Sequence, residues 1–498
     1  MNILILNPPA YRGVKFIREG RCEQRLSSFQ YVMVPISLPS IAALLRAKGH
    51  SVKIIDSTVE DTSVQKMLED TKKIDPQLII FNTATATFYG DVEFIKAVKE
   101  ISKSHLSAIG AHVSSLPEQV LRESPLDSVI RSEPEYTAYE LAQALEAGED
   151  LTTVEGLSVK INNKIIHNAK RPFIKNLDDL PFPARDLIKN ERYVMPFSNK
   201  PYTLLVSSRG CTHNCIYCTA RQYYGNKLRL RSAENVVDEV EEIVNKYGIN
   251  DITMWSDTFT LDRDFVVSVS DEILKRGLKL NWMANSRVDR VDYELMKIMK
   301  KSGCSMLSFG VESGAQNILN NVKKGATLEQ AEQAFEAARE AGIETIAHFM
   351  LGLPGETKET VKQTIRFAKK IRPDYAQFYC AIPFPGTEFH DIAQKNGWIV
   401  TNNWSNYEIN QPIISLPGFS NTQLKKAKKR AFMSFYFRPT YVLKTLARAK
   451  SLKEALNIIK QGLSFLNNWA LSSDSDKDNI SEEMRLSSGE KQCLKKIS

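Results

Sequence analysis

The sequence lacks any run of about 20 uninterrupted apolar residues, the length that a membrane-spanning helix needs. Its opening residues, Met1 to Leu6, have neither the basic start nor the small-residue cleavage site of a secretory signal. The excess of positive over negative charge is also small, since the net charge is only +8 over 498 residues. This balance favours small anionic ligands or a lipid surface over a dedicated nucleic-acid binder. We therefore expect a folded cytoplasmic protein that binds no nucleic acid.

Cysteine is scarce as well, and seven cysteines in a chain of this size do not form a disulfide framework. Four of them are scattered, at Cys22, Cys304, Cys380 and Cys493, and scattered cysteines are usually small buried hydrophobes. The other three fall within residues 211–218. The cysteines therefore indicate one local site rather than cross-links.

Short apolar strands alternate with helical stretches over residues 1–145. Strands are predicted at residues 2–6, 52–55, 78–82 and 106–109, and helices at 38–48 and 92–102. This alternation predicts an α/β domain with a doubly wound, Rossmann-like parallel sheet. Such sheets bind ligands beyond the carboxyl ends of their strands, and here these ends are rich in small and hydroxyl residues. That edge suits a cofactor that bears a nucleotide or a phosphate.

A second series of strands and helices occupies residues 200–402, after a linker predicted over residues 146–199. Its six strands are predicted at residues 203–207, 251–255, 280–284, 305–310, 345–350 and 375–381. Helical stretches rich in Glu and Lys separate these strands. Six such units can curl into a partial (β/α)6 barrel, in which the chemistry takes place on the loops that follow the strands.

The remaining chain is predicted to form a small basic helical region over residues 403–471 and a disordered polar tail over residues 472–498. Residues 424–460 contain eleven Lys or Arg, interleaved with aromatic residues, and one acidic residue, Glu454. One interpretation is a helical cap on the barrel whose lysines stay in water. The other is peripheral contact with the inner face of the membrane or with a lipid substrate.

Three cysteines follow the first strand of the second series, at Cys211, Cys215 and Cys218. Thiolates at this spacing can bind three irons of a four-iron four-sulfur (4Fe-4S) cluster from one loop and leave the fourth iron open. A zinc site is the competing interpretation. Structural zinc prefers four ligands in paired knuckles, and His213 lies inside the loop, where it cannot easily complete a tetrahedron. We therefore expect an iron–sulfur cluster with an open iron.

The Cys-x-x-x-Cys-x-x-Cys motif after strand one of a six-strand series resembles the radical S-adenosylmethionine superfamily over roughly residues 200–400. In that family the open iron is chelated by S-adenosylmethionine, and electron transfer splits this molecule into methionine and a 5′-deoxyadenosyl radical. The resemblance implies that the aromatic residue before the third cysteine, and groups after strands two to five, bind S-adenosylmethionine. These residues are Tyr217, Ser256, Asp257, Thr258, Asn285, Arg287, Glu312, Ser313 and Gly352.

The amino-terminal domain resembles the cobalamin-binding domain of the class B methylase branch of this superfamily. The matching segments are Asn7-Pro8-Pro9, Arg18-Glu19-Gly20-Arg21-Cys22, Gly110-Ala111-His112 and Glu133-Pro134-Glu135. The resemblance and the positions of the strand ends together predict that five residues contact the cofactor, namely Pro8, Thr83, Gly110, His112 and Glu133. None of the seven histidines has the Asp-x-His-x-x-Gly context that ligates cobalt, so cobalamin is expected base-off without a histidine ligand. For His112 a structural role is the alternative.

The resemblance implies a radical methyltransferase that transfers a methyl group to an unactivated carbon of a small-molecule or lipid substrate. It also implies an external one-electron donor of the flavodoxin or ferredoxin type. Two alternatives stay open. One is an anaerobic oxidative cyclase, which pairs cobalamin with the same barrel, and the other is a cobalamin or redox sensor without turnover.

Overall fold

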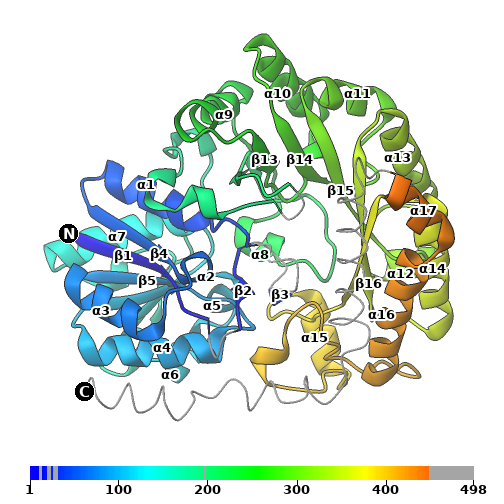
Figure 1. Ribbon diagram of the computed structural model, residues 1–498. Coiled ribbons are helices and arrows are strands. Elements are labelled where there is room, and N and C mark those ends of the chain that lie inside the picture. The colour runs from blue at the N-terminus through cyan, green and yellow to red at the C-terminus, as the bar shows by residue number, and fades with distance from the viewer. Residues whose placement is uncertain (11–13, 20–23, 26–31, 196–197, 448–498) are drawn as a thin grey trace.

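The computed structural model describes residues 1–10, 14–19, 24–25, 32–195 and 198–447. It contains two large sheets, each with its own helices, and two short two-stranded sheets (Figure 1). Cys22, Cys493, residues 20–22 of the second predicted cobalamin-domain segment, part of the basic region and the predicted polar tail lie outside the described residues. No helix in the described part of the chain is long and apolar enough to cross a bilayer.

The first sheet has seven strands in the order β4-β1-β5-β6-β7-β8-β9. The first five pair in parallel, and β8 and β9 add antiparallel strands at one edge. The strands are β1 (Asn2–Asn7), β4 (Ser51–Asp56), β5 (Leu78–Asn82), β6 (His105–Ile109), β7 (Ser128–Ile130), β8 (Leu157–Ile161) and β9 (Lys164–His167). Strand β1 lies between β4 and β5, so the order reverses there, and ligands of such sheets bind at this switch point.

Helices cover both faces of this sheet and bury two separate apolar cores. Leu38 and Leu45 of α1, with Leu141 of α7, pack on one face, whereas Leu68 of α3 and Ile95 of α4 pack on the other. The helices are α1 (Ser37–Ala47), α2 (Ser57–Glu60), α3 (Val64–Ile74), α4 (Phe88–Ile101), α5 (Ala111–Ser115), α6 (Pro117–Glu123) and α7 (Pro134–Ala147). The predicted doubly wound, Rossmann-like domain is confirmed.

The structure differs from the sequence prediction between residues 146 and 199. Strands β8 and β9 form a hairpin that extends the first sheet, although this segment was expected to be a linker. The turn is made by Asn162 and Asn163, both at positive φ (49° and 63°), which matches the two-residue hairpin turn that asparagine favours. The remainder of the segment contains short 3-10 turns, such as η3 (Arg185–Leu187), and it crosses to the second sheet.

The second sheet is an open barrel of six parallel strands in sequence order. The strands are β10 (Tyr202–Leu205), β13 (Asp251–Met254), β14 (Asn281–Ser286), β15 (Cys304–Glu312), β16 (Glu344–Leu351) and β17 (Tyr375–Cys380). The outer helices are α9 (Ala233–Tyr247), α10 (Arg263–Lys275), α11 (Tyr293–Lys301), α12 (Gln316–Asn321), α13 (Leu328–Glu340) and α14 (Lys358–Ile371). The predicted partial (β/α)6 barrel is confirmed.

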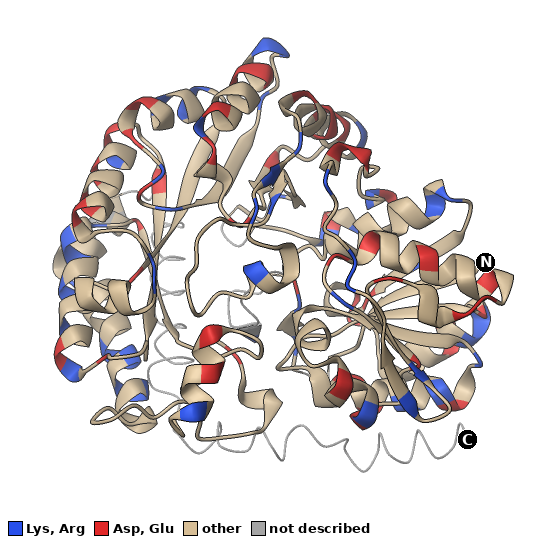
Figure 2. Ribbon diagram, turned by 180° about the vertical axis from the view of Figure 1, so that it is seen from behind, with Lys and Arg blue, Asp and Glu red and all other residues tan. Residues whose placement is uncertain are grey.

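Alternate residues of the barrel strands face the outer helices and the concave side. Phe309 of β15 contacts Phe335 of α13, and Phe378 of β17 contacts Phe432 of the carboxyl region. Because side chains alternate along a strand, Ser308 and Tyr379 face the concave side, where they keep intermediate exposure. Figure 2 shows basic and acidic residues interspersed along the outer helices.

The carboxyl region packs on the open edge of the barrel through α16 (Asn421–Tyr436), which α17 (Pro439–Ala447) follows. Helix α15 (Glu388–Lys395) precedes this region and contacts the cysteine loop, where the Phe389 amide donates to the Ile216 carbonyl at 2.9 Å. The aromatic residues of the carboxyl region are used in its packing, because Phe432 and Phe435 contact Phe378 and the Tyr436 hydroxyl donates to the Ala376 carbonyl at 2.8 Å. Described residues of this region therefore form a helical cap on the barrel. The expectation that its lysines stay in water fails at Lys428, which is buried and donates to Asn410 Oδ1 at 2.8 Å.

Candidate functional site: the cysteine loop and the facing edge of the first sheet

The three-cysteine loop leaves the barrel after β10 and is closed at its base by a short hairpin. Strand β11 (Ser208–Arg209) pairs with β12 (Arg229–Leu230), and helix α8 (Ala220–Tyr224) lies between them. The loop begins at Gly210, which has φ +85° and whose amide donates to Asp257 Oδ2 at 3.0 Å. A Cβ at this glycine would lie 2.2 Å from the Lys227 carbonyl oxygen. The turn into Cys211 therefore requires glycine.

Replacing Gly210 with alanine is expected to lower cluster incorporation several-fold. Alanine is disfavoured at positive φ, and its Cβ would force the Lys227 backbone away, so Cys211 would shift relative to the other two cysteines. Iron content per chain after anaerobic reconstitution measures the effect. Gly248→Ala is the matched control, since Gly248 also has positive φ but no atom within 4 Å of an added Cβ. Equal iron content in both variants would contradict the prediction.

Arg287 lies beside the second cysteine of the loop. Its Nη1 is 4.0 Å from Cys215 Sγ, its Nη2 donates to the Lys324 carbonyl at 2.7 Å, and its Nε donates to Asp289 at 2.9 Å. Burial alone lowers the pKa of Arg287, but hydrogen bonding to Asp289 raises it above its ordinary value. Asp289 and the Lys324 carbonyl therefore hold Arg287 next to the second cysteine of the loop.

Tyr217 and Glu312 meet at the carboxyl end of β15. Burial, followed by the charge of Glu312, raises the pKa of Tyr217 well above its ordinary value. Glu312 follows a break in strand register after Gly310 and has φ +68°, an uncommon backbone conformation for a glutamate. Its carboxylate accepts from Lys324 Nζ at 2.8 Å, and both side chains are buried. Strain of this kind often accompanies a functional position.

Three polar residues follow β13 beside the cysteine loop, and of these Ser256 and Thr258 are buried whereas Asp257 is half-buried. Ser256 Oγ is 2.8 Å from Ser207 Oγ and accepts from the Ser208 amide at 3.2 Å. Asp257 holds Gly210, and Thr258 donates to the Asp257 carbonyl at 2.7 Å. The structure therefore brings Ser256 and Asp257 to the loop, where they support its backbone. Direct contact of Ser256, Asp257 and Thr258 with S-adenosylmethionine stays a prediction.

The other residues predicted to bind S-adenosylmethionine differ from one another in burial and in their contacts. Asn285 is half-buried near the end of β14. Ser313 is fully buried, and its Oγ is 3.2 Å from Thr364 Oγ1 of α14. Its hydroxyl therefore already makes a contact within the fold. The Gly352 amide donates to Glu356, and a Cβ there would lie 2.8 Å from Leu424 of α16. Their role in binding stays a prediction.

The cysteine loop offers a donor set that suits an iron–sulfur cluster. Cys211, Cys215 and Cys218 form no disulfide and have intermediate exposure, and all three lie on one loop. Cys304 and Cys380 are buried, and burial raises the pKa of the Cys380 thiol to about 11. Within the described ranges, no three His, Cys, Asp or Glu side chains are placed to hold a single metal ion. In a cubane, by contrast, each thiolate binds a different iron.

Pro8, Thr83 and Gly110 lie at the carboxyl edge of the first sheet. Ser57 Oγ donates to the Pro8 carbonyl at 2.7 Å, and the Thr83 amide donates to the Ile109 carbonyl at 3.0 Å. Gly110 has φ +127°, and a Cβ there would lie 2.1 Å from the Thr83 carbonyl oxygen. The loops after β5 and β6 therefore approach each other closely, as a cofactor-binding edge requires.

His112 is buried at this edge between two aromatic rings. Its ring centroid lies 4.8 Å from that of Phe88 and 5.2 Å from that of Trp404, which comes from the carboxyl region. Burial lowers the pKa of His112 to about 3, so the ring is neutral. Neither ring nitrogen has a hydrogen-bond partner among the described residues, nor does Trp404 Nε1. These buried orphan groups fit an edge that hydrogen-bonds a cofactor.

Glu133 is occupied by the cysteine loop. Its carboxylate accepts from Arg229 Nη1 at 2.8 Å and from Arg209 Nη1 at 3.2 Å, and it also accepts the Ile174 amide. Glu133 thus joins the first domain to the base of the loop, and its predicted contact with cobalamin stays a prediction. Sequence reasoning did not single out Arg209 or Arg229, because their carboxylate partners lie 74 to 96 residues away in the chain.

A second group missed by the sequence analysis lies on the concave side of the barrel. His348 of β16 joins Ser308 of β15 at 2.5 Å through Nε2 and Tyr379 of β17 at 3.2 Å through Nδ1. The sequence carries little signal for this face, because Ile346 and Met350, which alternate with the buried residues of β16 as His348 does, are themselves apolar.

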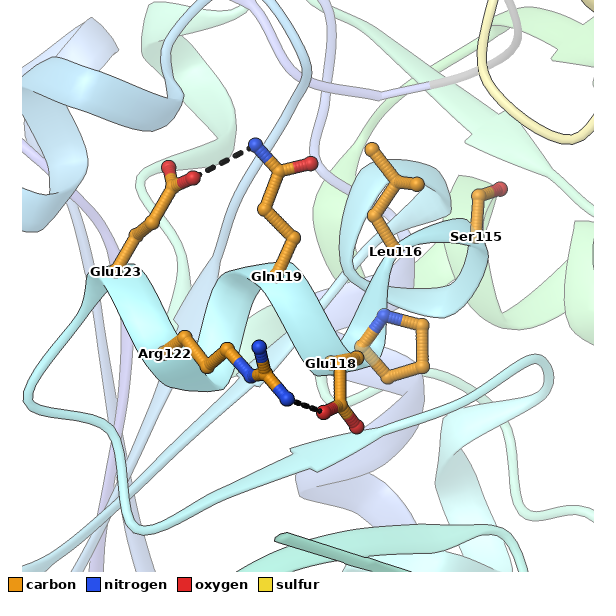
Figure 3. Close-up of a pocket in the computed structure, with 7 residues that line it drawn as sticks. Ser115, Leu116, Glu118, Gln119, Arg122 and Glu123 are labelled. Carbon is orange, nitrogen blue, oxygen red and sulfur yellow. Dashed lines mark hydrogen bonds and ion pairs between the residues drawn. The ribbon is translucent and has the colours of Figure 1, made fainter.

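The depression drawn in Figure 3 lies on the surface of α6 and has a volume of about 430 Å³. It is lined by Ser115, Leu116, Pro117, Glu118, Gln119, Arg122 and Glu123. Its longer side chains pair along the helix, Arg122 with Glu118 and Gln119 with Glu123. None of the three cysteines lines it, so the candidate site is the loop and not this depression.

Two family models match the chain. Residues 205–368 match the Radical SAM superfamily, where SAM denotes S-adenosylmethionine, and residues 25–142 match the B12 binding domain. These segments coincide with most of the barrel and most of the first domain.

Relatives extend over most of the chain. An uncharacterized methyltransferase of Pyrococcus horikoshii is 36% identical over 448 residues, which cover 90% of this chain and 95% of that protein. An anaerobic magnesium-protoporphyrin IX monomethyl ester cyclase of Cereibacter sphaeroides is 28% identical and covers 80% of this chain and 66% of the cyclase.

Two solved structures share the fold. The cobalamin-dependent S-adenosylmethionine radical enzyme OxsB matches with a TM-score of 0.73 and 16% identity over 94% of this chain and 71% of its own. The radical S-adenosylmethionine methyltransferase TsrM from Kitasatospora setae matches with a TM-score of 0.67 and 19% identity, covering 80% of this chain and 79% of its own. With both domains matched in order and a relative aligned over nearly its whole length, the chain belongs to the family of cobalamin-dependent radical SAM enzymes, which includes methyltransferases.

Proposed function

We propose that the protein is a radical methyltransferase that transfers a methyl group from S-adenosylmethionine to an unactivated carbon of a small-molecule substrate. One S-adenosylmethionine supplies the methyl group and a second supplies the 5′-deoxyadenosyl radical. The observation that carries the proposal is the placement of the cysteine loop against the carboxyl edge of the first sheet, through Glu133. Two cofactor sites on facing edges are what this division of labour needs.

The roles of the chain's own residues follow from their contacts. Cys211, Cys215 and Cys218 would hold a 4Fe-4S cluster, which supplies the electron that cleaves S-adenosylmethionine. Arg287 Nη1 lies 4.0 Å from Cys215 Sγ, and Asp257 fixes the backbone at Gly210. The edge formed by Pro8, Thr83, Gly110 and His112 would hold cobalamin in its base-off form. We infer an external flavodoxin- or ferredoxin-type electron donor and a cytoplasmic location.

The concave side of the barrel supports binding of the substrate. Ser308, His348 and Tyr379 form a hydrogen-bonded row across three neighbouring strands, all half-buried. Such a row can orient a polar group of a substrate while the carbon to be methylated lies toward the cysteine loop. The substrate bound there is proposed to be a small molecule, and lipid is the alternative.

The test is anaerobic reconstitution of the whole chain with iron, sulfide and hydroxocobalamin, followed by reaction with S-adenosylmethionine and a reductant. We expect about four irons and one cobalamin per chain, with formation of both 5′-deoxyadenosine and S-adenosylhomocysteine. A zinc-containing loop, or no 5′-deoxyadenosine above background, would overturn the proposal, and the second result would favour a sensor.

An oxidative cyclase is the second candidate, because a cyclase is among the relatives that align over most of this chain. Product mass distinguishes the two functions. A methylated product gains one carbon and two hydrogens, whereas ring closure adds no carbon. Substrate consumption with 5′-deoxyadenosine but without S-adenosylhomocysteine would favour the cyclase.

A further inference from the structure

Both ends of the cysteine loop are held by the same short segment of the first domain. Arg209 and Arg229 face each other in the hairpin at the base of the loop. Glu135 accepts from Arg209 Nη2 at 2.5 Å and from Arg209 Nη1 at 3.2 Å, and Glu133 accepts from both arginines. We call these four residues the Arg–Glu clamp. Because its acidic half precedes and begins α7, it lies just beyond the carboxyl end of β7.

Three of the four clamp residues are buried, and Arg229 is half-buried. Relative exposure is 6% for Arg209, 4% for Glu133 and 2% for Glu135. The Arg209 guanidinium also lies 5.4 Å from the ring centre of Tyr224, at the end of α8. Gln222 of α8 accepts from Ser115 Oγ at 3.1 Å, and its carbonyl accepts from Ser132 Oγ at 3.4 Å. The first domain therefore touches the loop at its base and again behind its third cysteine.

Such a buried cluster fixes the relative position of the groups that it joins more than it stabilises the fold. The attraction within a buried ion pair exceeds the free energy needed to remove its charges from water by little, so its net stabilisation is small. A two-point guanidinium–carboxylate contact, however, fixes both distance and angle between the groups that it joins. Here those groups are the start of the cysteine loop, one residue before Gly210, and the cofactor edge of the first sheet.

We propose that the Arg–Glu clamp sets the position of the cofactor edge of the first domain relative to the cysteine loop, and that Arg209 and Glu135 are positioning residues for methyl transfer from S-adenosylmethionine to cobalt. This inference rests on the proposed function. In the transfer the methyl carbon–sulfur bond breaks and its electron pair stays on S-adenosylhomocysteine. The new carbon–cobalt bond uses an electron pair of cobalt that an added low-potential reductant, Ti(III) citrate, has provided. Cleavage of S-adenosylmethionine to 5′-deoxyadenosine depends on the cysteine loop alone, so it does not require that the first domain be held in position.

The experiment compares Glu135→Gln with the wild-type holoenzyme, without substrate, in the presence of S-adenosylmethionine and Ti(III) citrate. The rate of S-adenosylhomocysteine formation is expected to fall at least about tenfold, since misplacing reacting groups by an ångström can cost about 100-fold. Iron content, cobalamin affinity and 5′-deoxyadenosine formation are expected to stay within about twofold of wild type. The matched control is Glu140→Gln on the same helix, which pairs with Arg171 and not with the loop.

A second variant guards against a folding defect caused by leaving Arg209 unpaired. The double substitution Arg209→Met/Glu135→Leu removes both charges, an exchange that buried pairs often tolerate. The proposal predicts the same selective loss of S-adenosylhomocysteine in this variant. It is overturned if the loss is less than twofold in both variants, or if iron content and cobalamin affinity fall in both. A wild-type enzyme that makes no S-adenosylhomocysteine at all would overturn the proposed function, and this inference with it.

Discussion

Cys215→Ala is expected to abolish both the iron–sulfur absorbance and the formation of 5′-deoxyadenosine. Two remaining thiolates cannot hold a cubane whose fourth iron must stay open, so the cluster would be lost rather than weakened. Cys215 Sγ also lies 4.0 Å from Arg287 Nη1, so the variant removes this contact as well. Iron content, the visible spectrum and chromatography of the reaction products measure the result.

Cys380→Ala is the matched control for this prediction. Cys380 is fully buried at the end of β17, and its Sγ lies 3.8 Å from the Asn410 carbonyl oxygen, away from the loop. The strand places it on the same outer face as Phe378, which packs on α16, so it does not face the concave side. We expect this variant to keep its iron and its 5′-deoxyadenosine formation. A full iron complement in Cys215→Ala would remove the cluster assignment.

The sequence predicts the barrel strands well because each is a short apolar run between helical stretches. All six strands were located within a few residues of their observed bounds, from Tyr202–Leu205 to Tyr375–Cys380. Local patterns could not reveal the hairpin of β8 and β9, since β9 is mostly exposed and Asn162-Asn163 lacks the glycine of the commonest turn. Its assignment to the first sheet depends on pairing with β7, which is a tertiary property.

Within the candidate site, too, the features encoded by neighbouring residues could be predicted, and those that join distant segments could not. The cysteine motif is local, so spacing alone indicated its chemistry. The clamp of Arg209 and Arg229 by Glu133 and Glu135 joins segments that are distant in the chain, and nothing in one sequence shows which arginine meets which carboxylate. The strain at Glu312 was equally hidden, because a positive φ at a glutamate comes from the register break in β15 and not from composition.

Glu239→Ala is expected to destabilise the barrel by about 3–5 kcal/mol, the usual cost of leaving buried charges without their partner. Glu239 of α9 is 1% exposed and accepts from two buried arginines, from Arg185 at 2.6 Å and from Arg231. Arg185 comes from the segment that crosses between the sheets and also donates to the Leu204 carbonyl of β10 at 2.8 Å. Without the carboxylate, both guanidinium groups would stay buried next to the first barrel strand.

Denaturant unfolding under anaerobic conditions measures this change, with Glu242→Ala as the control on the same helix. Glu242 pairs with Lys246 at 3.4 Å on the surface, so its loss should cost no more than about 1 kcal/mol. Equal unfolding midpoints for the two variants would contradict the argument, because burial is the main difference between the two carboxylates.

The pH dependence of the Glu239→Ala effect gives an independent check on its cause. Burial alone raises the pKa of Glu239, but the charges of Arg231 and Arg185 outweigh it and hold the pKa below its ordinary value. A carboxyl with a depressed folded-state pKa contributes stability that is present above its unfolded pKa and lost as pH falls through the folded pKa. The stability difference between wild type and Glu239→Ala should therefore be full at neutral pH and shrink on acidification below the ordinary glutamate range. A difference that stays constant through that range would indicate lost packing rather than lost charge.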